Sequence, residues 1–263
     1  SQHDFGSKTI YGTAANYGGE DVIPIIAARR ATARFLVRKL FNFFVYPVDA
    51  SGADQSTIEK YADVYFSNDH SIAKLLRAIF TSDEFFSDRA RFALVKSPPE
   101  FVVGAIRMLG ATYNPGTSSF QDGAQVPSDF STLLGQELLN PPDVSGWPGG
   151  LAWINTSTLL NRYTFADVLA STRPSDSNAP GVFAPPDLLR KYARANVAKT
   201  VGRLVNTLGL LVLDETALNN LSTYLQTGIN GLPAPFHPND AGIDQKARGL
   251  VHLAMCLPEF QLN

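Results

Sequence analysis

The residues best able to do chemistry are few. The chain has four histidines and one cysteine. His3 stands directly before Asp4, and a carboxylate that holds a histidine can make it a general acid or base. We therefore name His3 and Asp4 as candidate catalytic residues. The alternative is a histidine that a local hydrogen bond merely fixes in place.

A second candidate is the segment 141–155, which is rich in proline, glycine and tryptophan. Its glycines allow positive φ angles or a close approach of backbone. It holds both tryptophans of the chain, Trp147 and Trp153. In one interpretation the segment binds a ligand, because tryptophans stack on sugar rings and flat apolar groups. The residues that would make these contacts are Trp147, Trp153, Asp143, Asn155 and Arg162. In the other interpretation both tryptophans fill the core of a rigid turn.

A third candidate is the row of arginines at positions 30, 34 and 38, which the four-residue spacing places on one helix face. Guanidinium groups bind oxyanions in a bidentate manner, so Arg34 is a candidate ligand contact. The alternative is an ion-paired face with acids such as Glu20, Asp21 and Asp63. The same pattern predicts that Phe43 and Phe44 lie on the opposite, buried side.

Standard cofactor and metal motifs are missing from the sequence. It has no nucleophile elbow, zinc-protease motif, dinucleotide fingerprint or phosphate loop. The run from Asp49 to Lys60 begins like a calcium loop but lacks glycine at its sixth position and glutamate at its twelfth. The lone Cys256 excludes a disulfide framework within the chain. We predict no cofactor and no metal site.

Composition indicates a globular protein. Of 263 residues, 44% are hydrophobic and 17% are charged, with a net charge of −2. This balance gives no overall field that would favour nucleic acid. No apolar run approaches the roughly 18 residues of a membrane span.

The dominant hydrophobic period is helical, and no stretch alternates as a strand does. We predict a mainly α fold, an irregular bundle of about ten helices with long Pro/Gly-rich loops and little or no sheet. The predicted helices are 20–46, 55–66, 70–81, 98–109, 128–139, 155–171, 186–193, 195–212, 214–227 and 241–257. Asp69 is the expected N-cap of the helix over 70–81. A linker over 171–186 would separate a main body, 1–172, from a C-terminal helical bundle, 187–263, packed on it.

Five stretches of the sequence form a recognisable pattern: His3–Thr9, Ala33–Leu40, Ser97–Gly104, Pro141–Asn155 and Pro258–Gln261. In this order they resemble the C-terminal portion of the bacterial domain of unknown function 1800 family. The resemblance covers nearly the whole chain, and the segment 141–155 is its most specific part.

The resemblance implies an exported, extracytoplasmic bacterial protein, either periplasmic or secreted. The partners that it implies are a co-encoded sulfatase-like exported protein or a glycan, and an N-terminal half that precedes this region. We weigh two functions. The first is a non-catalytic binding or assembly module of the cell envelope. The alternative is a hydrolase or carbohydrate-active enzyme that acts on an extracellular polymer, with its site near 141–155.

Overall fold

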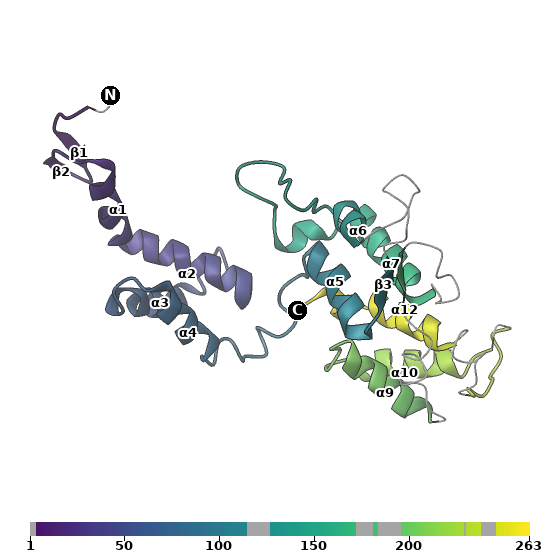
Figure 1. The fold of residues 1–263 in the computed structure, drawn as a ribbon. Helices are drawn as coiled ribbons and strands as arrows, with labels where there is room; N and C mark the ends of the chain where they lie inside the picture. The colour runs from purple at the N-terminus through teal and green to yellow at the C-terminus, as the bar shows by residue number, and fades with distance from the viewer. Residues whose placement is uncertain (1–3, 115–126, 172–180, 184–195, 229, 238–245) are drawn as a thin grey trace. The chain divides into compact units, whose positions relative to one another are not determined.

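The fold is mainly α-helical, as predicted (Figure 1). The computed structural model describes residues 4–114, 127–171, 181–183, 196–228, 230–237 and 246–263. These residues form ten α-helices and two small two-stranded sheets. The chain divides into two compact units, Ser1–Leu94 and Val95–Asn263, which we call unit 1 and unit 2 and describe separately.

The boundary between the units differs from the one that composition suggests. The predicted linker, 171–186, lies within unit 2, and most of it falls outside the described residues. Its described part, β4 (Gly181–Phe183), pairs antiparallel with β3 (Thr112–Asn114). In addition, α7 (Thr156–Ser171) and α12 (Arg248–Cys256) pack on each other across the predicted boundary. Long-range packing, rather than the local density of proline and glycine, decides what belongs to one core.

Unit 1 consists of a short hairpin and four helices. The single helix predicted over 20–46 is in fact two helices, because Arg29 is extended, with φ −80° and ψ 134°. The helix predicted over 70–81 is capped by Ser71, whose Oγ accepts the Lys74 N–H, and not by Asp69. The elements are β1 (Lys8–Ile10), β2 (Thr13–Ala15), α1 (Gly19–Ala27), α2 (Arg30–Phe44), α3 (Gln55–Ser67) and α4 (Ile72–Phe80).

The core of unit 1 lies between α2, α3 and α4. Helix α2 buries Ala33, Val37 and Phe41, which recur every fourth residue on one face. The Phe41 ring lies 5.1 Å from that of Tyr61 on α3. The prediction that Phe43 and Phe44 are buried is wrong, since they are 72% and 38% exposed. The face of α2 that packs is therefore the one that carries Ala33, Val37 and Phe41.

One carboxylate ties the end of α4 to α3. Glu84 accepts hydrogen bonds from the Lys60 ammonium at 2.7 Å and the Tyr61 hydroxyl at 2.8 Å. Burial by itself would raise the pKa of Glu84, but these hydrogen bonds more than offset it and lower the pKa to about 2. The ionised form of Glu84 therefore stabilises unit 1.

We predict that Glu84→Gln destabilises the protein by about 1–3 kcal/mol at neutral pH, because the buried Tyr61 hydroxyl and Lys60 lose a charged acceptor. A carboxylate with a lowered pKa stabilises the fold above its unfolded pKa, and that stability is lost as pH falls toward 2. Urea denaturation from pH 7 to pH 2 should therefore show a weaker acid dependence in the variant. The exposed neighbour provides the control, Asp83→Asn. An equal loss of stability in Glu84→Gln and Asp83→Asn would contradict the role assigned to the Glu84 carboxylate.

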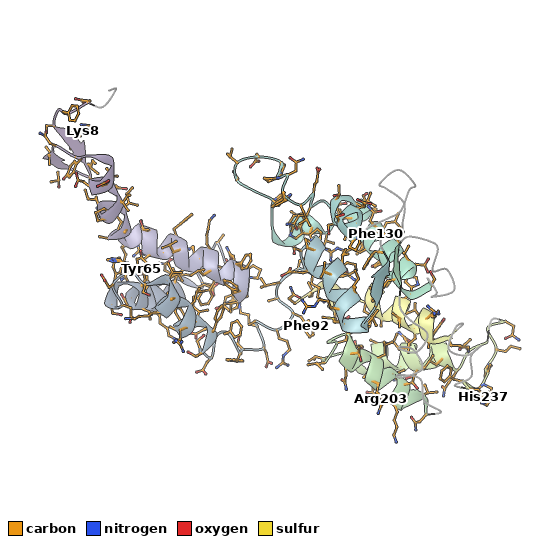
Figure 2. All side chains as sticks on the ribbon, in the orientation of Figure 1. Lys8, Tyr65, Phe92, Phe130, Arg203 and His237 are labelled. Carbon is orange, nitrogen blue, oxygen red and sulfur yellow. The ribbon has the colours of Figure 1, made fainter. Side chains whose placement is uncertain are left out.

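Unit 2 is built around aromatic side chains from four segments. Phe101, Phe130, Phe165 and Phe260 are all buried, and neighbouring rings meet edge to face. Figure 2 labels Phe130. The elements are α5 (Pro98–Leu109), β3, α6 (Pro127–Leu133), the 3-10 helix η1 (Gly150–Trp153), α7, β4, α9 (Val197–Thr207), α10 (Glu215–Leu225), α12 and the 3-10 helix η4 (Pro258–Gln261).

Glycines set several helix ends in unit 2. Helix α5 covers 98–109 as predicted and ends at Gly110, whose φ is 64°. Helix α6 ends earlier than the predicted 128–139, because the chain turns at Gly135, with φ 97°. Helix α9 likewise ends before Gly209, with φ 69°. Predicted helix 186–193 lies outside the described residues.

A three-helix pattern occurs once in each unit. Helices α2, α3 and α4 pack in succession, as do α9, α10 and α12. The middle helix follows an aspartate in both cases, and apolar residues stand four, seven and eleven positions after it. The last helix ends shortly before a Glu-Phe pair. The matching positions are Asp54, Ile58, Tyr61, Tyr65, Glu84 and Phe85 in unit 1 and Asp214, Leu218, Leu221, Leu225, Glu259 and Phe260 in unit 2.

We predict opposite effects for two helical glycines of unit 2. A Cβ at Gly249 on α12 would overlap the Tyr224 hydroxyl, so Gly249→Ala should destabilise the protein by about 1–3 kcal/mol. A Cβ at Gly202 on α9 meets nothing within 4 Å, so Gly202→Ala should stabilise it by about 0.5–1 kcal/mol. Thermal and urea denaturation measure both. Stability changes of the same sign in both variants would contradict the close packing of Gly249 against Tyr224.

Candidate functional site

The segment between α6 and α7 presents apolar side chains to solvent. It forms an open arc that leads away from the helices of unit 2 (Figure 1). Leu139 and Val144 are almost fully exposed, and Leu151 is 81% exposed. Isolated exposed leucines are ordinary, but several on one segment are typical of an interaction site.

Local hydrogen bonds and glycines shape this arc. The Asp143 carboxylate accepts the Ser145 N–H at 2.6 Å, and its carbonyl accepts the Gly146 N–H at 3.1 Å. Gly146 and Gly150 have positive φ angles of 87° and 61°, which other residues rarely adopt. Asp143, a predicted ligand contact, is exposed and holds this turn.

The two tryptophans have different surroundings. Trp153 is buried, and the six-membered part of its ring lies against Gly135. Its carbonyl accepts the Thr158 hydroxyl at 2.9 Å. Trp147 is partly exposed. The core-filling interpretation therefore describes Trp153, while Trp147 has surface that a ligand could contact.

Asn155 fixes the start of α7. Its side-chain oxygen accepts the Thr158 N–H, and the Thr158 hydroxyl accepts the Asn155 N–H, both at 3.0 Å. This reciprocal pair satisfies two backbone donors at the beginning of the helix. Asn155 is exposed, but its oxygen already serves as a cap.

Arg162 is a core residue, which differs from the ligand contact expected of it. Its side chain is fully buried. It donates to the Lys96 carbonyl at 2.7 Å and to the Gln261 side-chain oxygen at 3.4 Å, and it lies 4.8 Å from the Phe101 ring centroid. Burial lowers its pKa to about 10. A side chain enclosed in this way has no surface left for a ligand.

Lys96 is a second buried cation beside Arg162. Its ammonium donates to the Phe260 carbonyl at 2.8 Å and lies 4.2 Å from the Phe260 ring centroid. Burial, helped by the charge of Arg162 and opposed by that of Glu100, lowers the pKa of Lys96 to about 8. Lys96 and Arg162 donate to backbone carbonyls and to the Gln261 amide oxygen rather than to carboxylates. These hydrogen bonds join the start of α5 to the C-terminal segment.

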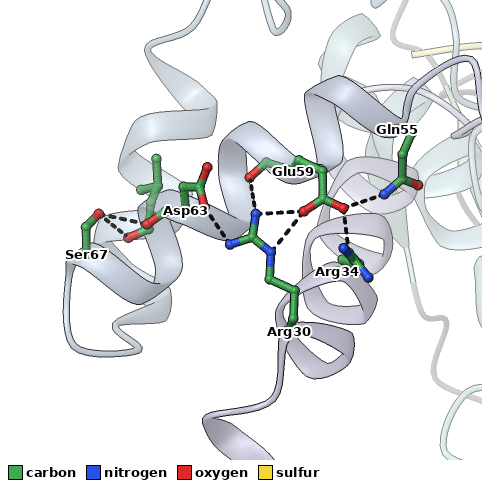
Figure 3. A network of polar contacts seen from close by, with 7 residues as sticks. Arg30, Arg34, Gln55, Glu59, Asp63 and Ser67 are labelled. Carbon is green, nitrogen blue, oxygen red and sulfur yellow. Dashed lines mark hydrogen bonds and ion pairs between the residues drawn. The ribbon is translucent and has the colours of Figure 1, made fainter.

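Arg34 belongs to an ion-pair network in unit 1 (Figure 3). Glu59 on α3 accepts hydrogen bonds from Arg30 at 2.7 and 2.9 Å and from Arg34 at 2.5 Å. Arg30 also pairs with Asp63 at 2.5 Å. Both arginines hold the pKa of the Glu59 carboxyl below its ordinary value. The arginine row is therefore the ion-paired face proposed as the alternative to a ligand contact. Asp63 is one of the acids expected to pair with it.

The candidate pair at the start of the sequence is described only in part. His3 lies outside the described residues. Asp4 is exposed; its carboxylate accepts the Gly6 N–H at 2.7 Å and lies 4.0 Å from the Lys8 ammonium. Within the described ranges, no group of three histidine, cysteine, aspartate or glutamate residues could hold a metal. Across the same ranges, no helix has the length and apolar character needed to cross a membrane.

Comparison with known families places the chain in one of them. Residues 1–262 match the family described as protein of unknown function, DUF1800. The chain belongs to the DUF1800 family. No curated protein and no solved structure matches it.

Two features of this DUF1800 chain escape sequence reasoning. One is the exposed apolar set Leu139, Val144 and Leu151. Its sequence signal is that apolar residues continue beyond the point where Gly135 ends α6. The other is Asp69-His70, a second adjacent acid–histidine pair whose Nδ1 and Oδ1 atoms lie 3.9 Å apart. Both residues have positive φ angles, 51° and 59°.

We predict that Arg162→Met destabilises this DUF1800 protein by about 2–4 kcal/mol. The substitution leaves the buried Lys96 carbonyl and Gln261 amide without their donor, and unpaired buried polar groups are costly. Urea denaturation measures the effect. The matched control is Arg107→Met on the exposed surface of α5, expected to change stability by about 0.5 kcal/mol or less. A small effect at position 162 would show that its hydrogen bonds do not support the core.

Proposed function

We propose that this protein is a non-catalytic binding or assembly module of the cell envelope, acting outside the cytoplasm. The observation that carries the proposal is the exposure of Leu139, Val144 and Leu151 on an arc whose ends are fixed. Placing apolar side chains in water is unfavourable, and burying them against a partner recovers about 25 cal/mol per Å². A protein partner therefore suits this surface best.

The base of the arc supports a binding role. Trp153 and the Asn155–Thr158 pair hold one end in the core and at the start of α7. Gly135 turns the chain at the other end. A contact surface carried on fixed ends loses little conformational entropy when it binds. The candidate polar residues Asp143, Asn155 and Arg162 each have local partners and do not converge on a common point through any hydrogen bond in the described part of unit 2.

Photo-cross-linking in the source cell tests the proposal. A photoreactive amino acid at Val144 should yield one dominant cross-linked product in the full-length protein. In the variant Leu139→Ser/Val144→Ser/Leu151→Ser, the photoreactive group is placed at Ser145. The yield of cross-linked product should fall at least about tenfold relative to the protein with the group at Ser145 and no serine substitutions, since each lost apolar contact weakens binding. The stability of the triple variant should change by about 0.5 kcal/mol or less per substitution. Cell fractionation of the same samples tests the location.

Unit 2 offers a matched control. Leu211, Val212 and Leu232 are also exposed apolar residues, but they lie outside the arc. Their triple substitution by serine should leave the cross-linked product unchanged. No product at Val144, or an equal loss in both triple variants, would overturn the proposal.

A further inference from the structure

The arc lies in a long stretch of sequence without positive charge. Between Arg107 and Arg162 there is no lysine or arginine, although charged residues make up 17% of the chain. The charged residues in this interval are Asp122, Asp129, Glu137 and Asp143. The chain as a whole is nearly neutral, with a net charge of −2, so the negative charge is a local property of this stretch.

Two of these acids are close in sequence to the exposed apolar residues: Glu137 is two positions before Leu139, and Asp143 directly precedes Val144. Glu137 and Asp143 are both exposed, and their oxygens accept hydrogen bonds from the Asn140 amide and the Ser145 N–H. Neither forms an ion pair with a cation in the part of the chain that the structure describes. We call Glu137, Leu139, Asp143, Val144 and Leu151 the arc surface. It combines apolar area with uncompensated negative charge.

We propose that the arc surface binds a cationic amphipathic segment of a partner protein, in which lysine or arginine flanks a row of apolar side chains. This inference rests on the proposed function. Opposite charges across an interface speed association and select the partner, while apolar contacts at the centre supply most of the affinity. Anionic lipid, nucleic acid and acidic polysaccharide carry the same sign of charge as the arc surface, and repulsion disfavours them.

Leu139 supports an interaction role in a second way. It combines almost complete exposure with a φ angle of 66°, a left-handed conformation that glycine adopts far more easily. Glycine would relieve the strain and remove the exposed apolar side chain. A residue that is unfavourable for folding on both counts is typical of a contact residue.

Fluorescence anisotropy with designed peptides tests the partner chemistry on the full chain. The probes are a labelled leucine/lysine amphipathic helix and its leucine/glutamate counterpart of the same length. The lysine peptide should bind at least about tenfold more tightly and should weaken as salt rises. Glu137→Gln/Asp143→Asn should reduce the difference between the peptides. Leu139→Gly should weaken binding and raise the melting temperature.

Controls keep the outcomes distinct. Leu139→Ser/Val144→Ser/Leu151→Ser should abolish binding of the lysine peptide, and Leu211→Ser/Val212→Ser/Leu232→Ser should not. Equal affinity for both peptides, retained binding in the arc variant, or cosedimentation with phosphatidylglycerol vesicles would overturn the inference. If the peptide results contradict the inference while the cross-link at position 144 persists, only the proposed chemistry of the partner is overturned. Loss of both overturns the proposed function as well.

Discussion

The buried guanidinium of Arg162 sets the arrangement of unit 2. A cation in the core needs hydrogen-bond partners, because leaving a buried charge unpaired costs about 3–5 kcal/mol, a large part of the stability of a domain. The partners of Arg162 are the carbonyl of Lys96, before α5, and the side chain of Gln261, near the end of the chain. Three segments far apart in sequence therefore have to meet at α7. Lys96 strengthens the same junction through the Phe260 carbonyl, which explains why the C-terminal segment is part of this core.

The arc depends on that junction, since it leads directly into α7. Trp153 is buried and Asn155 caps the helix, so the chain enters the core at a fixed place. Residues 137–145 and 148–152 before this point are exposed, and Leu139, Val144 and Leu151 among them face solvent. A rigid scaffold that carries an exposed loop is a common way to build a binding surface. The tryptophans illustrate the division of roles, because one belongs to the scaffold and the other, Trp147, is partly exposed.

Unit 1 uses its charges differently. The arginines of α2 face acids on α3 with the same four-residue spacing, so Arg30 and Arg34 both reach Glu59 (Figure 3). Ion pairs of this kind neutralise the positive stripe and align the two helices. The negative charge of the arc surface has no such matching stripe among the described residues of unit 2. This contrast is the physical basis for seeking a cationic partner at the arc surface.

The sequence by itself determined the features that depend on neighbouring residues. These include the helical class, the family, the end of α5 at Gly110 and the positive φ of Gly146, because propensities and turns act over a few residues. Only the tertiary structure decided which side chains are buried. Arginine and tryptophan can serve a core or a ligand equally well, and distant segments enclose Arg162 and Trp153 while leaving Phe43 and Val144 in solvent. The division of the chain after Leu94 has the same origin, since it depends on which helices pack together rather than on where proline and glycine occur.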